Sequence, residues 1–411
     1  MTCPGSGKMP ASLDTTAGRP FPPVVPGGRA GDSESAKAGK FSVIFCGVKI
    51  IRFLPWIAAA TLAAGCSAPL PSTELPPGRS VSAALEFPEL RDYRGELDVR
   101  LEGTGLDQPG IADIAKAAQL DFLVLGDVAK PGAADYGIGG FTSGILFIPG
   151  ASFPVDGGRI IAINPRAPID PATRSSELVG AIHDQEGIAI AASPAKFRSA
   201  GDYALADGIE IYNQRDAWTA ESSTSLYWRA IFLSTDRFLL RLASRPEENL
   251  AIYDRMSSGA RVALLAGIGA PDDMTVAGSK VGTFQQLFLF YTTHVLSPER
   301  SVDPMVEAIK RGHMYVSFDV LGYVPGFAFF ARDGETRTMM GEETRIAPSL
   351  KLQAELPAAA DRIVLLRDGV EVSSAENASN LEYTPTQPGT YRIEAYRKDH
   401  PWILSNPVYL R

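Results

Sequence analysis

Phe122-Leu-Val-Leu-Gly-Asp-Val128 is the stretch that decides the fold, because four apolar residues are followed at once by a glycine and a carboxylate. A short, continuously apolar run is typical of a strand that is buried on both faces of a sheet. Runs of the same kind recur at 187–192, 208–213 and 261–266, with helical stretches between them. Repeated strand–helix units predict an α/β fold with a parallel sheet covered by helices.

The pattern changes towards the C-terminus. Short strand candidates there are separated by turns such as Arg367-Asp-Gly369 and Gln387-Pro-Gly389. Closely spaced strands with turn residues between them are typical of a small β-sandwich. The sequence therefore predicts two folded domains, an α/β domain over 86–320 and a β-sandwich over 321–411.

The first 85 residues do not read as part of either domain. Residues 1–47 hold six prolines and eight glycines, and such a segment buries too little apolar surface to offset its ordering entropy. We expect 1–47 to be disordered or to precede the true start codon. Residues 48–65 have a basic start and a short apolar run, as a signal peptide does. Residues 66–85 are rich in Pro and Ser and are predicted to be a tether.

The end of the signal, Leu62-Ala-Ala-Gly-Cys66, resembles a bacterial lipobox, in which the cysteine becomes the lipidated first residue of the mature protein. The resemblance implies a lipid anchor on Cys66. Ser67 resembles the residue that directs such lipoproteins to the outer membrane. An ordinary signal peptide with a chance cysteine is the alternative. The expected location is the bacterial envelope, facing the periplasm.

Composition excludes several functions. The three cysteines are Cys3, Cys46 and Cys66, so the folded part has no disulfide, thiolate metal site or cysteine nucleophile. The formal net charge of −8 argues against a nucleic-acid partner, which needs a basic face. We therefore expect the partner to be the membrane, through the lipid, together with an unknown envelope protein or ligand.

Six motifs follow one another along the chain: Tyr93-Arg-Gly-Glu-Leu-Asp-Val-Arg-Leu101, Phe122-Leu-Val-Leu-Gly-Asp-Val128, Leu146-Phe-Ile-Pro-Gly-Ala-Ser152, Gly187-Ile-Ala-Ile-Ala-Ala-Ser-Pro194, Asp207-Gly-Ile-Glu-Ile-Tyr-Asn213 and Pro401-Trp-Ile-Leu-Ser-Asn-Pro-Val408. In this order they resemble the PHP family, named for polymerase and histidinol phosphatase, and in particular its secreted bacterial members. The resemblance implies a distorted barrel of about seven β/α units with its site at the C-terminal strand ends. It also implies hydrolysis of phosphoesters by metal-activated water.

Most metal ligands that the family would supply are absent from these motifs. Replacing imidazoles by valine, serine and arginine removes lone-pair donors and adds a cation that repels metals. A cluster of three metals is therefore implausible, and we expect no cofactor or, at most, one divalent metal. The positions that correspond to family ligands, of which Asp127 alone is unchanged, are Asp98, Arg100, Asp127, Val128, Ser152 and Ser193.

Three remaining carboxylates leave an alternative open. Asp98, Asp127 and Glu210 fall at neighbouring strand ends in the barrel and could together hold one Mg²⁺ or Ca²⁺. Asp127 and Glu210 are then the candidate catalytic residues. The competing interpretation is that Asp98 pairs with Arg100 or another nearby arginine in a plugged pocket, so that arginine charge replaces metal charge.

The other candidate features favour packing over chemistry. His183 is expected on a helix face and His294 in an apolar region, and no two of the four histidines have ligand spacing. An aromatic group that could line a ligand site is expected to be ordinary core, and comprises Tyr212, Trp218, Tyr227 and Trp228.

Together these observations favour a catalytically inactive PHP-like envelope lipoprotein that acts as a binding or scaffolding module. A metal-dependent phosphoesterase with a reduced carboxylate site is the alternative. A further possibility is that the β-sandwich is the working part and binds a glycan or protein.

Overall fold

The computed structural model describes residues 87–213, 240, 242–269, 274–276, 279–323 and 325–411. All of these belong to one compact unit, Ser72–Arg411. The predicted start segment 1–47, signal 48–65, lipidation site Cys66 and tether 66–85 lie outside the described residues, and stay predictions. Within the described part of the chain, no helix combines the length and apolar character that a membrane span requires.

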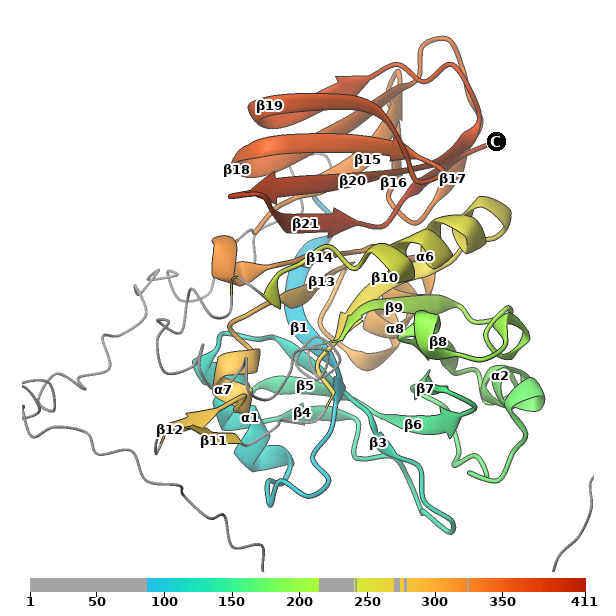
Figure 1. Ribbon diagram of the computed structural model, residues 1–411, viewed down its shortest axis with the longest axis vertical. Coiled ribbons are helices and arrows are strands. Elements are labelled where there is room, and N and C mark those ends of the chain that lie inside the picture. Colours follow the sequence, from blue (N-terminus) through green and yellow to red (C-terminus); the bar gives the residue numbers. More distant parts are fainter. Residues whose placement is uncertain (1–86, 214–239, 241, 270–273, 277–278, 324) are drawn as a thin grey trace, which may run out of the picture. The chain divides into compact units, whose positions relative to one another are not determined.

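The chain is a mixed α/β protein in which strands greatly outnumber helices (Figure 1). The expected α/β class is thus confirmed. Up to residue 321 the elements are β1 (Arg91–Val99), α1 (Gln108–Ala117), β2 (Phe122–Leu125), β3 (Asp127–Val128), β4 (Gly140–Thr142), β5 (Ile145–Ile148), β6 (Gly150–Val155), β7 (Gly158–Ile163), α2 (Ser175–Asp184), β8 (Ile188–Ala192), β9 (Gly208–Asn213), α6 (Glu247–Gly259), β10 (Ala263–Gly267), β11 (Met274–Val276), β12 (Ser279–Val281), α7 (Phe284–Leu287), β13 (Thr292–Ser297), α8 (Val302–Arg311), β14 (Met314–Ser317) and the 3₁₀ turn η3 (Asp319–Leu321).

The predicted parallel sheet is found in part, because parallel and antiparallel pairs both occur. Strands β1, β2 and β5 are parallel neighbours, as are β8, β9 and β10, but β7 is antiparallel to both β6 and β8. The physical reason is the turn Asp156-Gly157, which joins β6 directly to β7 as a hairpin. A hairpin can connect only antiparallel strands, because parallel pairing needs a long crossover.

The strands after residue 321 continue the sheet that contains β1. Strand β21 pairs with β14, so hydrogen bonding runs from β1 through β13, β14 and β21 to β20 and β18. The separate sandwich over 321–411 stays a prediction. These elements are β15 (Ala328–Asp333), β16 (Thr336–Met339), β17 (Glu343–Thr344), β18 (Lys351–Arg367), β19 (Val370–Tyr383), β20 (Gly389–Arg397), β21 (His400–Ser405) and β22 (Val408–Leu410).

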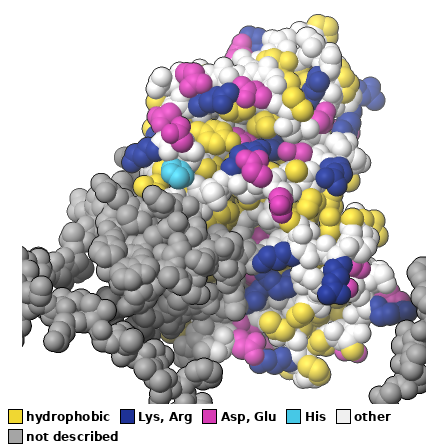
Figure 2. Space-filling model, in the orientation of Figure 1, with side chains coloured by type: hydrophobic (Ala, Val, Ile, Leu, Met, Phe, Trp, Pro, Cys, Tyr) yellow, Lys and Arg dark blue, Asp and Glu magenta, His cyan; other side chains and the backbone are white. Residues whose placement is uncertain are grey.

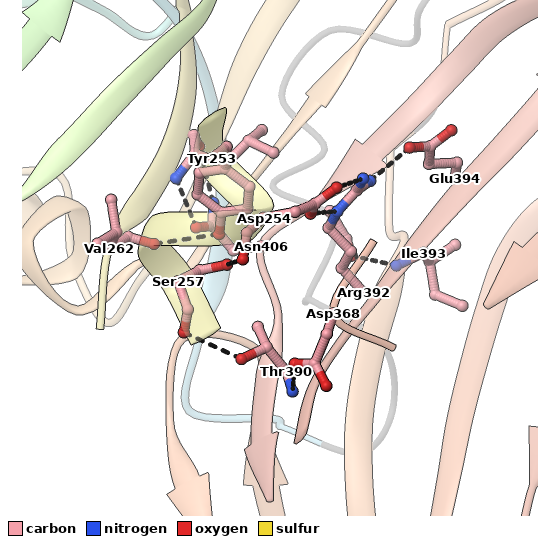
Figure 3. A network of polar contacts seen from close by, with 12 residues as sticks. Tyr253, Asp254, Ser257, Val262, Asp368, Thr390, Arg392, Ile393, Glu394 and Asn406 are labelled. Carbon is pink, nitrogen blue, oxygen red and sulfur yellow. Dashed lines mark hydrogen bonds and ion pairs between the residues drawn. The ribbon is translucent and has the colours of Figure 1, made fainter. Parts of the chain in front are cut away.

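Buried polar side chains fasten the last strands to α6 and β10 (Figure 3). Asn406 accepts from the Leu264 amide at 2.7 Å and donates to the Leu264 and Met314 carbonyls at 2.8 and 2.9 Å. The hydroxyl of Tyr253 donates to the Val262 carbonyl at 3.1 Å. Because a buried amide is costly unless all its hydrogen bonds are made, this arrangement fixes where the C-terminal strands lie against β10.

Charged side chains of both signs are interspersed on the visible face of the C-terminal strands (Figure 2). Examples are the exposed pairs Lys351–Glu382 and Arg362–Glu371 of the β18–β19 hairpin. A surface on which both signs alternate does not have the uniformly positive potential that attracts a polyanion.

Candidate functional site

The structure brings four predicted site positions together where β1, β6 and β9 approach one another. Asp98, Ser152 and Glu210 are fully buried, and Arg100 comes directly after the end of β1, two residues beyond Asp98. The end of β10 lies alongside, because the Ile268 amide donates to the Leu97 carbonyl at 3.0 Å. Side chains from strands far apart in the sequence therefore share one polar cluster.

A bulge in β1 turns Asp98 into this cluster. The pairing of β1 with β2 shifts register between Glu96 and Val99, and Asp98 has a φ of 55°. A non-glycine residue in the left-handed region carries a strain that the surroundings must offset. Hydrogen bonds to the Asp98 carboxylate offset this backbone strain, because side-chain donors contact both of its oxygens.

Two arginines and a serine supply those hydrogen bonds. Arg100 donates from Nε to Oδ1 of Asp98 at 3.2 Å and from Nη2 to Oδ2 at 3.0 Å. Ser152 donates from Oγ to Oδ1 of Asp98 at 3.1 Å. The ion pair between Asp98 and Arg100 expected from the sequence is therefore present, in the fork geometry that makes arginine–carboxylate pairs strong.

Arg159, at the start of β7, is the second cation of the cluster. Its Nη1 lies 3.0 Å from Oδ2 of Asp98 and donates to Oγ of Ser152 at 3.1 Å. Its Nη2 lies 3.7 Å from Oε2 of Glu210, whose Oε1 accepts from Asn213 at 2.9 Å. One guanidinium thus lies between the two buried carboxylates.

Glycines at two neighbouring strand ends let this cluster pack against backbone. A Cβ on Gly126 would lie 2.3 Å from Oδ1 of Asp98, and one on Gly267 would lie 2.0 Å from Oε1 of Glu210. Real Cβ atoms do not approach oxygens this closely, so the two glycines are required by the close packing. We call Asp98, Arg100, Ser152, Arg159 and Glu210 the arginine–carboxylate cluster.

The other predicted positions have different surroundings. Asp127 accepts the amide protons of Leu101 and Glu102 at Oδ1, at 2.8 and 2.9 Å, and so closes the loop after β1. Val128, in β3, is half-buried. Ser193 has a φ of 53° at the end of β8, before the turn that begins at Pro194.

The donor set does not fit a divalent metal. Two guanidiniums approach Asp98 to 3.0 Å, where their positive charge would repel a metal ion. In the part of the chain that the structure describes, no group of three His, Cys, Asp or Glu side chains is arranged to hold a metal. The carboxylate metal site on Asp98, Asp127 and Glu210 stays a prediction.

Sequence reasoning missed Arg159 as a site residue. The signal was its position directly after the Asp156-Gly-Gly158 turn, at the start of an apolar run. Sequence reasoning places site residues at the C-terminal ends of strands, whereas Arg159 lies near the N-terminal end of β7. A hairpin reverses β7, and so brings its N-terminal end beside the ends of β6 and β8.

Tyr212 is core, as predicted. Its ring makes edge-on contacts with Tyr291 and Phe318, with centroids 5.3 and 5.2 Å apart, and its hydroxyl donates to the Leu242 carbonyl at 2.7 Å. Burial raises its pKa far above the ordinary range. Trp218, Tyr227 and Trp228 lie outside the described residues.

The histidines expected to be structural have partners. His183 lies on α2 and its Nε2 is 2.8 Å from Asp207, which confirms its place on a helix face. His313 lies 2.9 Å from Glu342, and His400 lies 2.8 Å from the Ala243 carbonyl. His294 is fully buried, as expected, but among polar side chains.

A hollow on the described surface lies away from these residues. It has a volume of about 490 Å³ and is found between α6 and the turn from β18 to β19. Its lining includes Arg245, Glu247, Asp254, Asp368 and Val370, and none of the predicted site residues.

Comparison with known proteins finds a distant structural likeness. No family model matches the chain, and no curated protein matches it. A two-domain protein from Bacteroides vulgatus, described as containing a predicted PHP-like metal-dependent phosphoesterase, has a similar structure with a TM-score of 0.34 and 12% sequence identity, over 80% of this chain and 99% of that one. At this distance, the chain's own residues must decide what its site can do.

Proposed function

We propose that this chain is a catalytically inactive PHP-like protein, a distorted (β/α)7-like barrel followed by a small β-sandwich, that serves as a binding or scaffolding module in the bacterial envelope. The observation that carries the proposal is the position of Arg159 between Asp98 and Glu210. A guanidinium there balances the carboxylates that a metal would otherwise need. It cannot activate water as a Lewis acid does.

The test is metal content together with phosphoesterase activity. The full chain is loaded with Mn²⁺, Zn²⁺ or Mg²⁺, desalted and examined by elemental mass spectrometry, and is then assayed with p-nitrophenyl phosphate and its bis ester. We expect no retained metal and no turnover. Retained metal with turnover, both lost in Asp127→Asn while the variant stays folded, would establish the alternative phosphoesterase.

The envelope location rests on Cys66, and has its own test. We propose that Cys66 carries the lipid and that the mature chain faces the periplasm from the outer membrane. Cells fed a labelled fatty acid are expected to incorporate it into wild-type chain and into Cys46→Ser, and not into Cys66→Ser. Equal incorporation in the two variants would refute the lipid anchor.

A further inference from the structure

A second buried polar cluster lies on β1, β13, β14 and η3, apart from the arginine–carboxylate cluster. His294 is its centre, with Nδ1 2.7 Å from Oδ1 of Asp92 and Nε2 3.0 Å from Oγ of Ser317. All three residues are at most 9% exposed. The order carboxylate, imidazole, hydroxyl is that of a hydrolytic triad, in which the hydroxyl donates its proton to the imidazole.

The hydroxyl protons here point the other way. Ser317 donates from Oγ to Oδ1 of Asp319 at 2.6 Å, and Thr292 donates from Oγ1 to Oδ2 of Asp319 at 2.9 Å. Asp319 also accepts from Nε of Arg94 at 3.0 Å. A carboxylate paired with a guanidinium has no proton of its own to give, so each hydroxyl must supply the proton in its bond to Asp319.

The Nε2 atom of His294 therefore faces only lone pairs. The oxygens of Ser317 and Thr292 lie 3.0 and 3.3 Å from it, and both have directed their single proton to Asp319. Two lone pairs facing each other repel, so Nε2 must carry a proton and donate.

The same comparison of donors and acceptors shows the state of Nδ1. Asp92 accepts at Oδ2 from the Tyr315 hydroxyl at 2.5 Å and from the Gly326 amide at 3.1 Å. It accepts at Oδ1 from His294. With donors at both oxygens, Asp92 acts as an ionised acceptor, and Nδ1 must also carry a proton.

We infer that His294 donates hydrogen bonds from both ring nitrogens, one to Asp92 and the other to the hydroxyls that bind Asp319, and that it joins β1, β13, β14 and η3 instead of acting as the base of a triad. Charge balance supports this state. Two carboxylates, Asp92 and Asp319, face two cations, Arg94 and His294. Loss of the imidazolium proton would leave a buried net negative charge and one hydrogen bond without a proton.

The other ionisable groups near His294 do not supply a competing charge. The ring of Tyr315 stacks on His294 with centroids 4.3 Å apart, and burial raises its phenol pKa. Tyr323 lies 6.3 Å from His294, and burial raises its pKa to about 12. Burial also raises the pKa of Glu96 well above its ordinary value. Asp121 accepts from the Arg94 amide at 3.1 Å and pairs with Arg300 at 3.0 Å.

The same hydrogen bonds decide whether Ser317 can react. Ser317 is predicted to be inert as a nucleophile, because its proton is committed to Asp319.

Nitrogen NMR of the imidazoles in the full-length chain tests the inference. Each of the variants His183→Gln, His313→Gln and His400→Gln removes one imidazole signal. The signal that stays in all three belongs to His294, which is itself unchanged. At pH 7.5 both ring nitrogens of His294 are expected to show protonated shifts. A neutral tautomer at that pH in the folded chain would overturn the inference.

A reactivity test separates this arrangement from a triad. A fluorophosphonate probe labels serines whose hydroxyl is activated by a neutral imidazole. We expect no labelling of Ser317 in the folded chain at pH 7.5. Labelling that is lost in Ser317→Ala would overturn the inference, since it requires an unprotonated Nε2.

Discussion

Arg392 in β20 donates two hydrogen bonds to Asp254 in α6, from Nε at 2.7 Å and from Nη2 at 2.8 Å (Figure 3). The Arg392 side chain is 1% exposed, and it also pairs with Glu394. Glu394 in turn accepts two hydrogen bonds from Arg245, each of 2.8 Å. A continuous row of alternating charges therefore joins α6 and the segment before it to the C-terminal strands.

Removing Arg392 should destabilise the whole chain. Arg392→Met leaves the carboxylates of Asp254 and Glu394 buried without their main cation, and breaking a buried pair from one side costs about 3–5 kcal/mol. Urea denaturation measures the loss. Arg174→Met is the matched control, because Arg174 is 79% exposed and its ion pair with Glu177 is at the surface, so its loss should change the midpoint little. Equal effects of the two changes would contradict this prediction.

Glu394 should make the chain sensitive to acid. Burial alone would raise the pKa of this carboxyl, but Arg392 and Arg245 hold it at about 2, below its ordinary value of 4.5. Because this pKa is depressed in the folded chain, the ionised Glu394 contributes to the free energy of unfolding above pH 4.5, and this contribution is lost as pH falls towards 2. Unfolding midpoints measured from pH 6 to pH 2 should fall more steeply for the wild type than for Glu394→Gln. Parallel curves for the two proteins would show that Glu394 does not contribute to the loss of stability in acid.

Gly267 should not tolerate a methyl group. In Gly267→Ala the new Cβ would meet Oε1 of Glu210 and approach Cβ of Asp98 to 3.1 Å, so the arginine–carboxylate cluster must shift. We expect a loss of about 1–3 kcal/mol, as for other overpacked sites. Gly180→Ala is the control, because Gly180 lies in α2 with open space around it and should gain up to about 1 kcal/mol. Thermal melts of both variants measure the two changes, and an unchanged melting temperature in Gly267→Ala would contradict the prediction.

The sequence predicts this fold best where a strand is apolar on both faces. The strands β2, β8, β9 and β10 lie where continuous apolar runs place them. Strand β19, Val370–Tyr383, was not predicted, because its residues are mostly polar and exposed. It forms because β18 offers a long edge and the Asp368-Gly369 turn brings the chain back along that edge.

The candidate site was predictable in its carboxylates and less so in its cations. Asp98, Arg100 and Glu210 could be found because each follows or lies in a buried strand. Arg159 was missed, although it follows a turn between two apolar runs, because the prediction was confined to the C-terminal ends of strands and β7 presents its N-terminal end. The His294 cluster depends on three strands meeting in register, with Arg94 opposite His294 and His294 opposite Tyr315, and sequence spacing does not encode that pairing.

The pairing of Arg159 with Asp98 can be isolated by a double-mutant cycle. Arg159→Leu removes the cation that contacts both Asp98 and Glu210, and should cost about 3 kcal/mol. Asp98→Asn removes the carboxylate that Arg100 and Arg159 share. The double variant removes both partners of the ion pair, so its loss should be smaller than the sum of the two single losses by about 1–3 kcal/mol. Urea midpoints of the four proteins give the coupling. Additive losses would mean that Arg159 fills space at this site without carrying the charge that its position between the carboxylates implies.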